Sequence, residues 1–141
     1  MSSTTRNSDA AGVPPLRYAR WWSGLGVGAL AAGVAVALQP GGGLLLATLG
    51  DKLNHGLAFA FFTLWFGGIV APGRMWRVAL LLLAYGIAIE GAQALTPYRR
   101  AEFLDVGADA AGILLGWALS AAGLRHWCRQ LESWLVAPRS P

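Results

Sequence analysis

The chain has 141 residues, of which 55% are hydrophobic and only 13% charged, and its mean hydropathy is +0.49. Soluble domains carry about a quarter charged residues, so this composition argues against a water-soluble globule. The net charge of +4 comes from arginines scattered at segment ends, unlike the concentrated basic patch of a nucleic-acid-binding protein. The single cysteine, Cys128, excludes an internal disulfide and a multi-cysteine zinc site.

The amino-terminal part predicts a leader followed by a first membrane span. Residues 1–20 read as a disordered, basic leader, because 1–13 are rich in Ser and Thr without an apolar period. The run 21–38 follows Arg20 and contains no charged residue, and Pro40 lies just beyond its end. Trp21 and Trp22 stand where an interfacial aromatic belt would lie. A secretory signal is the alternative, since residues 35–37 (Ala-Val-Ala) resemble a cleavage site.

Three further apolar runs predict helices at 53–71, 78–95 and 106–124. Each reaches the ~20 residues that cross about 30 Å of hydrocarbon. Pro40, Pro72 and Pro97 fall between the runs, where they break no helix hydrogen bond. Runs of this length favour helices over the shorter, alternating strands of a barrel. The expected fold is all-α: a four-helix transmembrane bundle over residues 21–124.

Basic residues predict the orientation of this bundle. If the helices alternate, eight arginines face one side and three basic residues the other, so both termini are expected to be cytoplasmic. The first set is Arg6, Arg17, Arg20, Arg74, Arg77, Arg125, Arg129 and Arg139, and the second is Lys52, Arg99 and Arg100.

Residues 125–141 predict a cytoplasmic amphipathic tail. Trp127, Leu131, Trp134 and Leu135 recur at helical spacing, which favours a short carboxy-terminal helix lying in the inner interface. A cap packed under the bundle is the alternative.

Small residues at helical spacing predict close helix packing. Gly24 and Gly28 form one such stripe, and Gly112, Gly116 and Ser120 form a second. Stripes of this kind let helix backbones approach each other in membranes.

Ionisable residues from three separate segments converge on the outer half of the predicted bundle. Asp51 and His55 are four residues apart, as are Asp105 and Asp109, so each pair shares a helix face. Glu90 lies about 8 to 9 Å down its helix, where a lone carboxylate is costly. The outer set is Asp51, Lys52, His55, Glu90, Gln93, Arg99, Arg100, Glu102, Asp105 and Asp109. One interpretation is a purely structural ion-pair network; intramembrane ionisable groups are more often functional.

The order and spacing of these residues resemble the VanZ-like family of small bacterial membrane proteins. The matching fragments are Asp51-Lys52-Leu53-Asn54-His55, Glu90-x-x-Gln93 and Pro97-x-Arg99-x-x-Glu102-x-x-Asp105-x-x-x-Asp109-x-x-Gly112-x-x-x-Gly116. The family is named for a protein associated with teicoplanin resistance, so the resemblance implies a multi-pass protein of the bacterial inner membrane linked to glycopeptide resistance. Asp109 departs from the asparagine common in the family, and this puts in doubt any role that requires a neutral amide there.

Two functions follow as hypotheses. In the first, the outer cluster binds a polar headgroup or a lipid-linked envelope precursor, with Arg99 and Lys52 meeting its phosphate or carboxylate. The candidate ligand-binding residues are Asp51, Lys52, His55, Glu90, Gln93, Arg99, Asp105 and Asp109. In the second, a membrane-embedded hydrolase or transferase uses His55, Glu90 and Asp105 as catalytic groups.

No cofactor, resident metal or nucleic acid is expected, and a homo-oligomer stays open. With one histidine near the acids, Mg²⁺ or Ca²⁺ at the carboxylates is a better candidate than zinc. The inner half of the predicted spans contains no ionisable residue, which argues against a continuous proton or ion pathway.

Overall fold

The described part of the chain is entirely helical apart from its turns. The computed structural model describes residues 16–40, 50–98 and 102–135. These residues contain five α-helices and no strand: α1 (Ala19–Ala37), α2 (Asp51–Gly67), α3 (Met75–Ala94), α4 (Phe103–Ala121) and α5 (Trp127–Leu135). The all-α class is therefore confirmed. Most of the predicted leader, and the tail beyond Leu135, lie outside the described residues.

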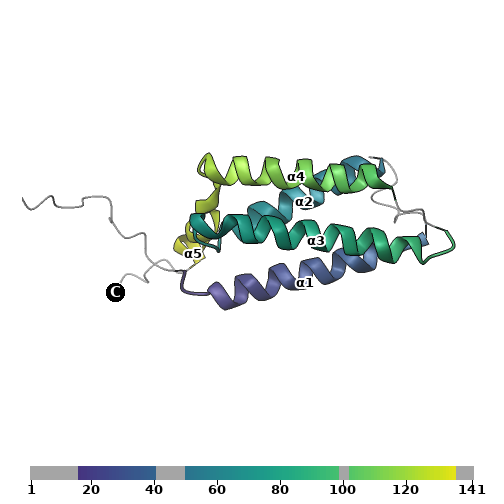
Figure 1. The fold of residues 1–141 in the computed structure, drawn as a ribbon. Helices are drawn as coiled ribbons and strands as arrows, with labels where there is room; N and C mark the ends of the chain where they lie inside the picture. Colours follow the sequence, from purple (N-terminus) through teal and green to yellow (C-terminus); the bar gives the residue numbers. More distant parts are fainter. Residues whose placement is uncertain (1–15, 41–49, 99–101, 136–141) are drawn as a thin grey trace, which may run out of the picture.

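Helices α1 to α4 run alternately up and down along a shared direction, and α5 lies at one end of them (Figure 1). The ends of α1 and α3 meet the beginnings of α2 and α4 at the opposite end, which we call the polar end. Helices α2 and α4 pack against each other over the longest interface, whereas α1 makes fewer contacts with its neighbours. The bundle is thus built on an α2–α4 pair.

The helix boundaries follow local chemistry. Helix α2 stops at Gly67, four residues before the predicted end, and Pro72 opens a short 3-10 turn, Pro72–Arg74, that leads into α3. Helix α4 ends at Ala121, because Gly123 adopts φ 117, a left-handed conformation that terminates helices. The other boundaries lie within three residues of the predicted spans.

Among the described residues, two helical segments are long and apolar enough to cross a membrane. They are Pro72–Ala94 and Phe103–Ala121, judged by length and composition. Helix α2 is shorter, with 17 residues, and α1 is rich in glycine and alanine and contains Arg20. Only 33% of the apolar stretch in each of these two segments is buried within the protein, whereas the core helix of a soluble domain is mostly buried.

Glycines on α4 allow the close approach of α2. A Cβ at Gly112 would collide with the backbone carbonyl of Gly56, and a Cβ at Gly116 would lie 2.5 Å from the carbonyl oxygen of Ala60. Ser120 continues the stripe, since a Cβ at Gly67 would lie 2.5 Å from its hydroxyl oxygen. The predicted stripe on the fourth segment therefore packs backbone against backbone.

The predicted stripe on the first segment is wrong. Gly24 and Gly28 are exposed, and a Cβ at either would meet no atom within 4 Å. The inward face of α1 instead carries Gly26, which packs against Trp65 and Phe66, and Gly33, which packs against Tyr85. These two glycines are seven positions apart, so the four-residue spacing of small residues alone does not identify the contact face.

Aromatic rings from α1, α2 and α5 pack together at the end of the bundle opposite the polar end. The rings of Trp22, Trp65 and Trp127 lie within 5.9 Å of one another, centroid to centroid. Burial of Cys128 raises the pKa of its thiol to about 12, so this cysteine stays neutral. Trp134 and Leu135, by contrast, are exposed. Helix α5 therefore packs as a cap at its start and leaves an apolar surface at its end.

Glu132 of α5 caps the beginning of α1. Its carboxylate accepts hydrogen bonds from the backbone N–H groups of Arg17 and Tyr18, at 2.8 and 3.0 Å, and from Trp22 Nε1 at 2.8 Å. Burial alone would raise the pKa of Glu132, but these three hydrogen bonds hold the pKa below its usual 4.5. A negative charge at a helix amino terminus also interacts favourably with the helix dipole.

We expect Glu132→Gln to lower the free energy of unfolding by about 1 kcal/mol near neutral pH, as for the loss of a helix cap. The pKa of Glu132 is lower in the folded protein than in the unfolded chain. The stabilisation is therefore fully present at pH values above the unfolded-state pKa, and it is lost as the pH falls through the folded-state pKa. Denaturant unfolding of the purified protein across this pH range measures it. Gln130→Ala, on an exposed position of the same helix, should show no such difference.

Candidate functional site

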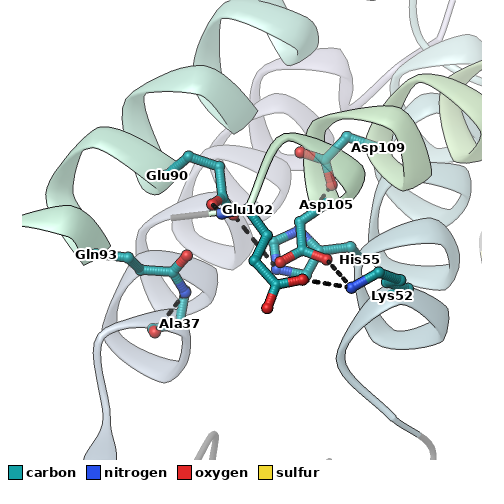
Figure 2. A network of polar contacts seen from close by, with 8 residues as sticks. All are labelled: Ala37, Lys52, His55, Glu90, Gln93, Glu102, Asp105 and Asp109. Atoms are coloured by element: carbon teal, nitrogen blue, oxygen red, sulfur yellow. Dashed lines mark hydrogen bonds and ion pairs between the residues drawn. The ribbon is translucent and has the colours of Figure 1, made fainter. Parts of the chain in front are cut away.

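Three helices deliver polar side chains to the polar end. The first turns of α2 carry Asp51, Lys52 and His55, the last turns of α3 carry Glu90 and Gln93, and the start of α4 carries Asp105 and Asp109. Figure 2 shows Lys52, His55, Glu90, Asp105 and Asp109 close together with Glu102, while Gln93 contacts Ala37 beside them. The other predicted ligand-binding residue, Arg99, lies outside the described residues, as does Arg100.

His55 lies at the centre of this network. Its Nδ1 donates a hydrogen bond to Asp109 Oδ1 at 2.8 Å, and its Nε2 lies 3.8 Å from Glu90 Oε1 (Figure 2). Asp109 is 0% exposed and His55 only 9%. A buried charged acceptor fixes both the ring orientation and the tautomer, with the proton on Nδ1. The remaining ring nitrogen therefore faces the carboxylates of α3 and α4.

Glu90 is a buried carboxylate with one satisfied oxygen. Its Oε2 accepts a hydrogen bond from the backbone N–H of Glu102 at 2.9 Å, which ties the end of α3 to the start of α4. Its Oε1 has no hydrogen-bond partner among the described residues. Buried polar atoms are nearly always paired, so each exception calls for an explanation.

Lys52 bridges two carboxylates at the edge of the site. Its Nζ lies 2.7 Å from Glu102 Oε2 and 3.4 Å from Asp105 Oδ1. The Lys52 and Glu102 side chains are about half exposed, whereas Asp105 is 1% exposed. An ion pair this exposed contributes little to stability. Its main effect is to place a positive charge at the mouth of an acidic site.

Gln93 joins the site to α1. Its Nε2 donates a hydrogen bond to the carbonyl oxygen of Ala37 at 3.0 Å, and Tyr98 Oη donates one to the carbonyl oxygen of Leu38 at 2.9 Å. Ala37 is the last residue of α1 and Leu38 follows it directly, so both carbonyls lack partners within the helix. Gln93 thus closes the carboxy terminus of α1 against α3, and it is 1% exposed.

A cavity of about 200 Å³ opens beside this network, between α1, α2 and α3. One part of its wall is polar and the other apolar. The polar lining is Asp51, Asn54, His55 and Gln93, and the larger apolar lining residues are Val36, Phe59, Phe62, Tyr85 and Ile89. The polar residues lie toward the polar end, and the apolar ones lie deeper along the helices.

The described residues of the site are strongly acidic. They hold five carboxyl groups, against a single ammonium on Lys52. Like charges brought together repel, so the cluster favours an added cation. The five carboxyl groups belong to Asp51, Glu90, Glu102, Asp105 and Asp109.

Two polar lining residues, Asn54 and Tyr85, are not among the predicted ligand-binding residues. Tyr85 Oη donates a hydrogen bond to the carbonyl oxygen of Leu30 at 2.6 Å, which holds α3 against the middle of α1. A tyrosine inside an otherwise apolar run was the available signal, because its hydroxyl needs a buried partner. Asn54 lies three residues after Asp51 and so shares its helix face.

The geometry supports two kinds of chemistry. Asp51, His55 and Asp105 each offer a ligand atom, and these atoms lie within 4.8 Å of one another, close enough to hold a metal ion. The Asp109–His55 pair also has the arrangement of an oriented base.

Comparison of the chain with protein-family models, with curated proteins and with solved structures gives no match.

Proposed function

We propose that this chain is an integral membrane protein that binds an amphipathic ligand, with the polar head at the acidic cluster and the apolar part in the neighbouring cavity. The observation that carries the proposal is the cavity itself, whose wall changes from polar to apolar along its length. Ligand sites are mostly apolar with a few placed polar groups, and a polar-to-apolar gradient matches a lipid or a lipid-linked precursor.

Exposed apolar side chains support membrane embedding. Leu81 on α3 is 71% exposed and Leu114 on α4 is 66% exposed. Both helices also have the length and composition of a membrane span. Soluble proteins rarely expose large continuous apolar surfaces. Helices α1 and α2 carry the same kind of surface, through Trp21, Leu25, Val27, Leu53, Leu57 and Phe61. On this basis all four helices cross the bilayer together.

The proposed orientation places the polar end outside the cytoplasm. The larger share of arginines lies at the α5 end or in the segments that lead to it, which the positive-inside rule assigns to the cytoplasm. Glu90 is four residues from the end of α3, or about 6 Å at 1.5 Å per residue. The site would then lie near the outer headgroups of the inner membrane, within reach of a lipid or envelope precursor.

The resemblance to the VanZ-like family remains part of this proposal. It is supported by the order and spacing of the motif residues, seven of which gather at the polar end. A role in glycopeptide resistance would follow if the bound precursor were a target of such antibiotics.

Native mass spectrometry of protein released from nanodiscs of phosphatidylethanolamine and phosphatidylglycerol tests the proposal. We expect the wild-type chain to retain lipid, and Ala58→Trp to lose most of it, because the indole would fill the cavity that Ala58 lines. Leu57→Trp is the matched control, since Leu57 is exposed on the same helix and does not line the cavity. Equal lipid retention in both variants would refute an amphiphile in this cavity.

A hydrolase or transferase acting on the same ligand is the second candidate. It is favoured by the Asp109–His55 hydrogen bond, which orients His55 Nε2 as a base toward the site. The same mass spectra separate the two functions, because a binding protein returns intact lipid whereas an enzyme returns cleaved or transferred products.

A further inference from the structure

Asp51, His55 and Asp105 have the relative positions of a cation-binding set. Their ligand atoms lie within 4.8 Å of one another, and a divalent ion about 2.1 to 2.3 Å from each ligand requires these side chains to move closer together. Asp51 and His55 are one turn apart on α2, and Asp105 reaches them from the first turn of α4. The α2–α4 pair, the most extensive interface of the bundle, therefore holds all three.

His55 is already arranged as a metal ligand. Its Nδ1–H is held by Asp109, at 2.8 Å, so the lone pair of Nε2 is directed away from that contact. Metal-binding histidines almost always donate their other ring N–H to a carboxylate or carbonyl in this way. Asp109 would act as a positioning residue, which explains why an acid is completely buried beside a histidine.

An unpaired buried oxygen supplies an independent observation. Glu90 Oε1 accepts no hydrogen bond from the described residues, although Glu90 is only 6% exposed, and Asp105 Oδ1 is contacted by the Lys52 ammonium at 3.4 Å. Glu90 Oε1 faces His55 Nε2 at 3.8 Å, too far for a hydrogen bond. A cation bound beside this imidazole would compensate the buried Glu90 oxygen.

We propose that Asp51, His55 and Asp105 bind one divalent cation at the mouth of the cavity, with water or ligand oxygens completing its coordination. One imidazole and two carboxylates suit Mn²⁺ better than Mg²⁺ or Ca²⁺, which prefer all-oxygen sites. The ion competes with the Lys52 ammonium, 3.4 Å from Asp105 Oδ1. The site needs no bound amphiphile, so it stands or falls separately from the proposed function.

Electron paramagnetic resonance of added Mn²⁺ tests the site in detergent without added lipid. The full chain, free of any histidine tag and stripped with a chelator, should remove one Mn²⁺ per chain from the free-ion signal. Asp105→Asn should abolish this binding, and Asp109→Asn should weaken it by about 10- to 100-fold, as for other residues that orient a metal ligand. No uptake by the wild-type chain, or full uptake by folded Asp105→Asn, overturns the proposal.

The two histidines of the chain provide a second readout that does not depend on removing an acid. Electron spin echo modulation of the wild-type Mn²⁺ complex should show nitrogen coupling from a coordinated imidazole. His55→Gln should remove that coupling and His126→Gln should retain it, because His126 lies at the α5 end. Absence of nitrogen coupling in the wild-type complex, or its persistence in His55→Gln, excludes His55 as a ligand.

Discussion

Gly112→Ala is expected to lower the free energy of unfolding by about 2 kcal/mol, within the range for overpacking a tight interface. The added Cβ would collide with the backbone carbonyl of Gly56, and a neighbouring backbone cannot rotate away as a side chain can. The α2–α4 pair would separate, and with it the shared position of His55, Asp105 and Asp109. Denaturant unfolding of the solubilised protein measures the loss.

Gly107→Ala is the matched control on the same helix. A Cβ at Gly107 would meet nothing within 4 Å, so the substitution should stabilise the protein by about 0.5 to 1 kcal/mol, as alanine does in a helix interior. The two alanines thus have opposite expected signs. Destabilisation of equal size at both positions would contradict the close packing of α2 on α4.

Asp109→Ala should cost about 3 kcal/mol, because it leaves the buried Nδ1–H of His55 without an acceptor. Asp109→Asn should cost far less, since the amide oxygen can accept the same hydrogen bond in the same volume. The comparison separates the hydrogen bond from the charge. Equal losses in the two variants would show that the negative charge, and not the hydrogen bond, stabilises His55.

The helices and the gathering of polar residues could be predicted from the sequence, because both depend on local periodicity. Apolar runs broken by prolines gave the helix positions, and spacing of four residues placed Asp105 and Asp109 on one face. That face also carries Gly112 and Gly116, so close packing buries the acids that share it. Here one pattern determined both the packing and the site.

Features that depend on tertiary contacts could not be predicted. The inward face of α1 is marked by Gly26 and Gly33, and only the aromatic rings they meet on α2 and α3 distinguish them from Gly24 and Gly28. Glu90 accepts a hydrogen bond from the backbone N–H of Glu102. A backbone donor is present at almost every position, so the sequence does not indicate this contact. The cap that Glu132 places on α1 joins residues more than 100 positions apart.

The placement of His55 between three helices is the centre of this account, and nitrogen NMR of the tag-free protein labelled at histidine measures it directly. His55 should appear with its proton on Nδ1, shifted downfield and slow to exchange, and this signal should disappear in Asp109→Ala. His126 supplies the internal reference. A His55 ring whose proton exchanges as quickly as that of His126, and whose signal is unchanged in Asp109→Ala, would contradict the buried network.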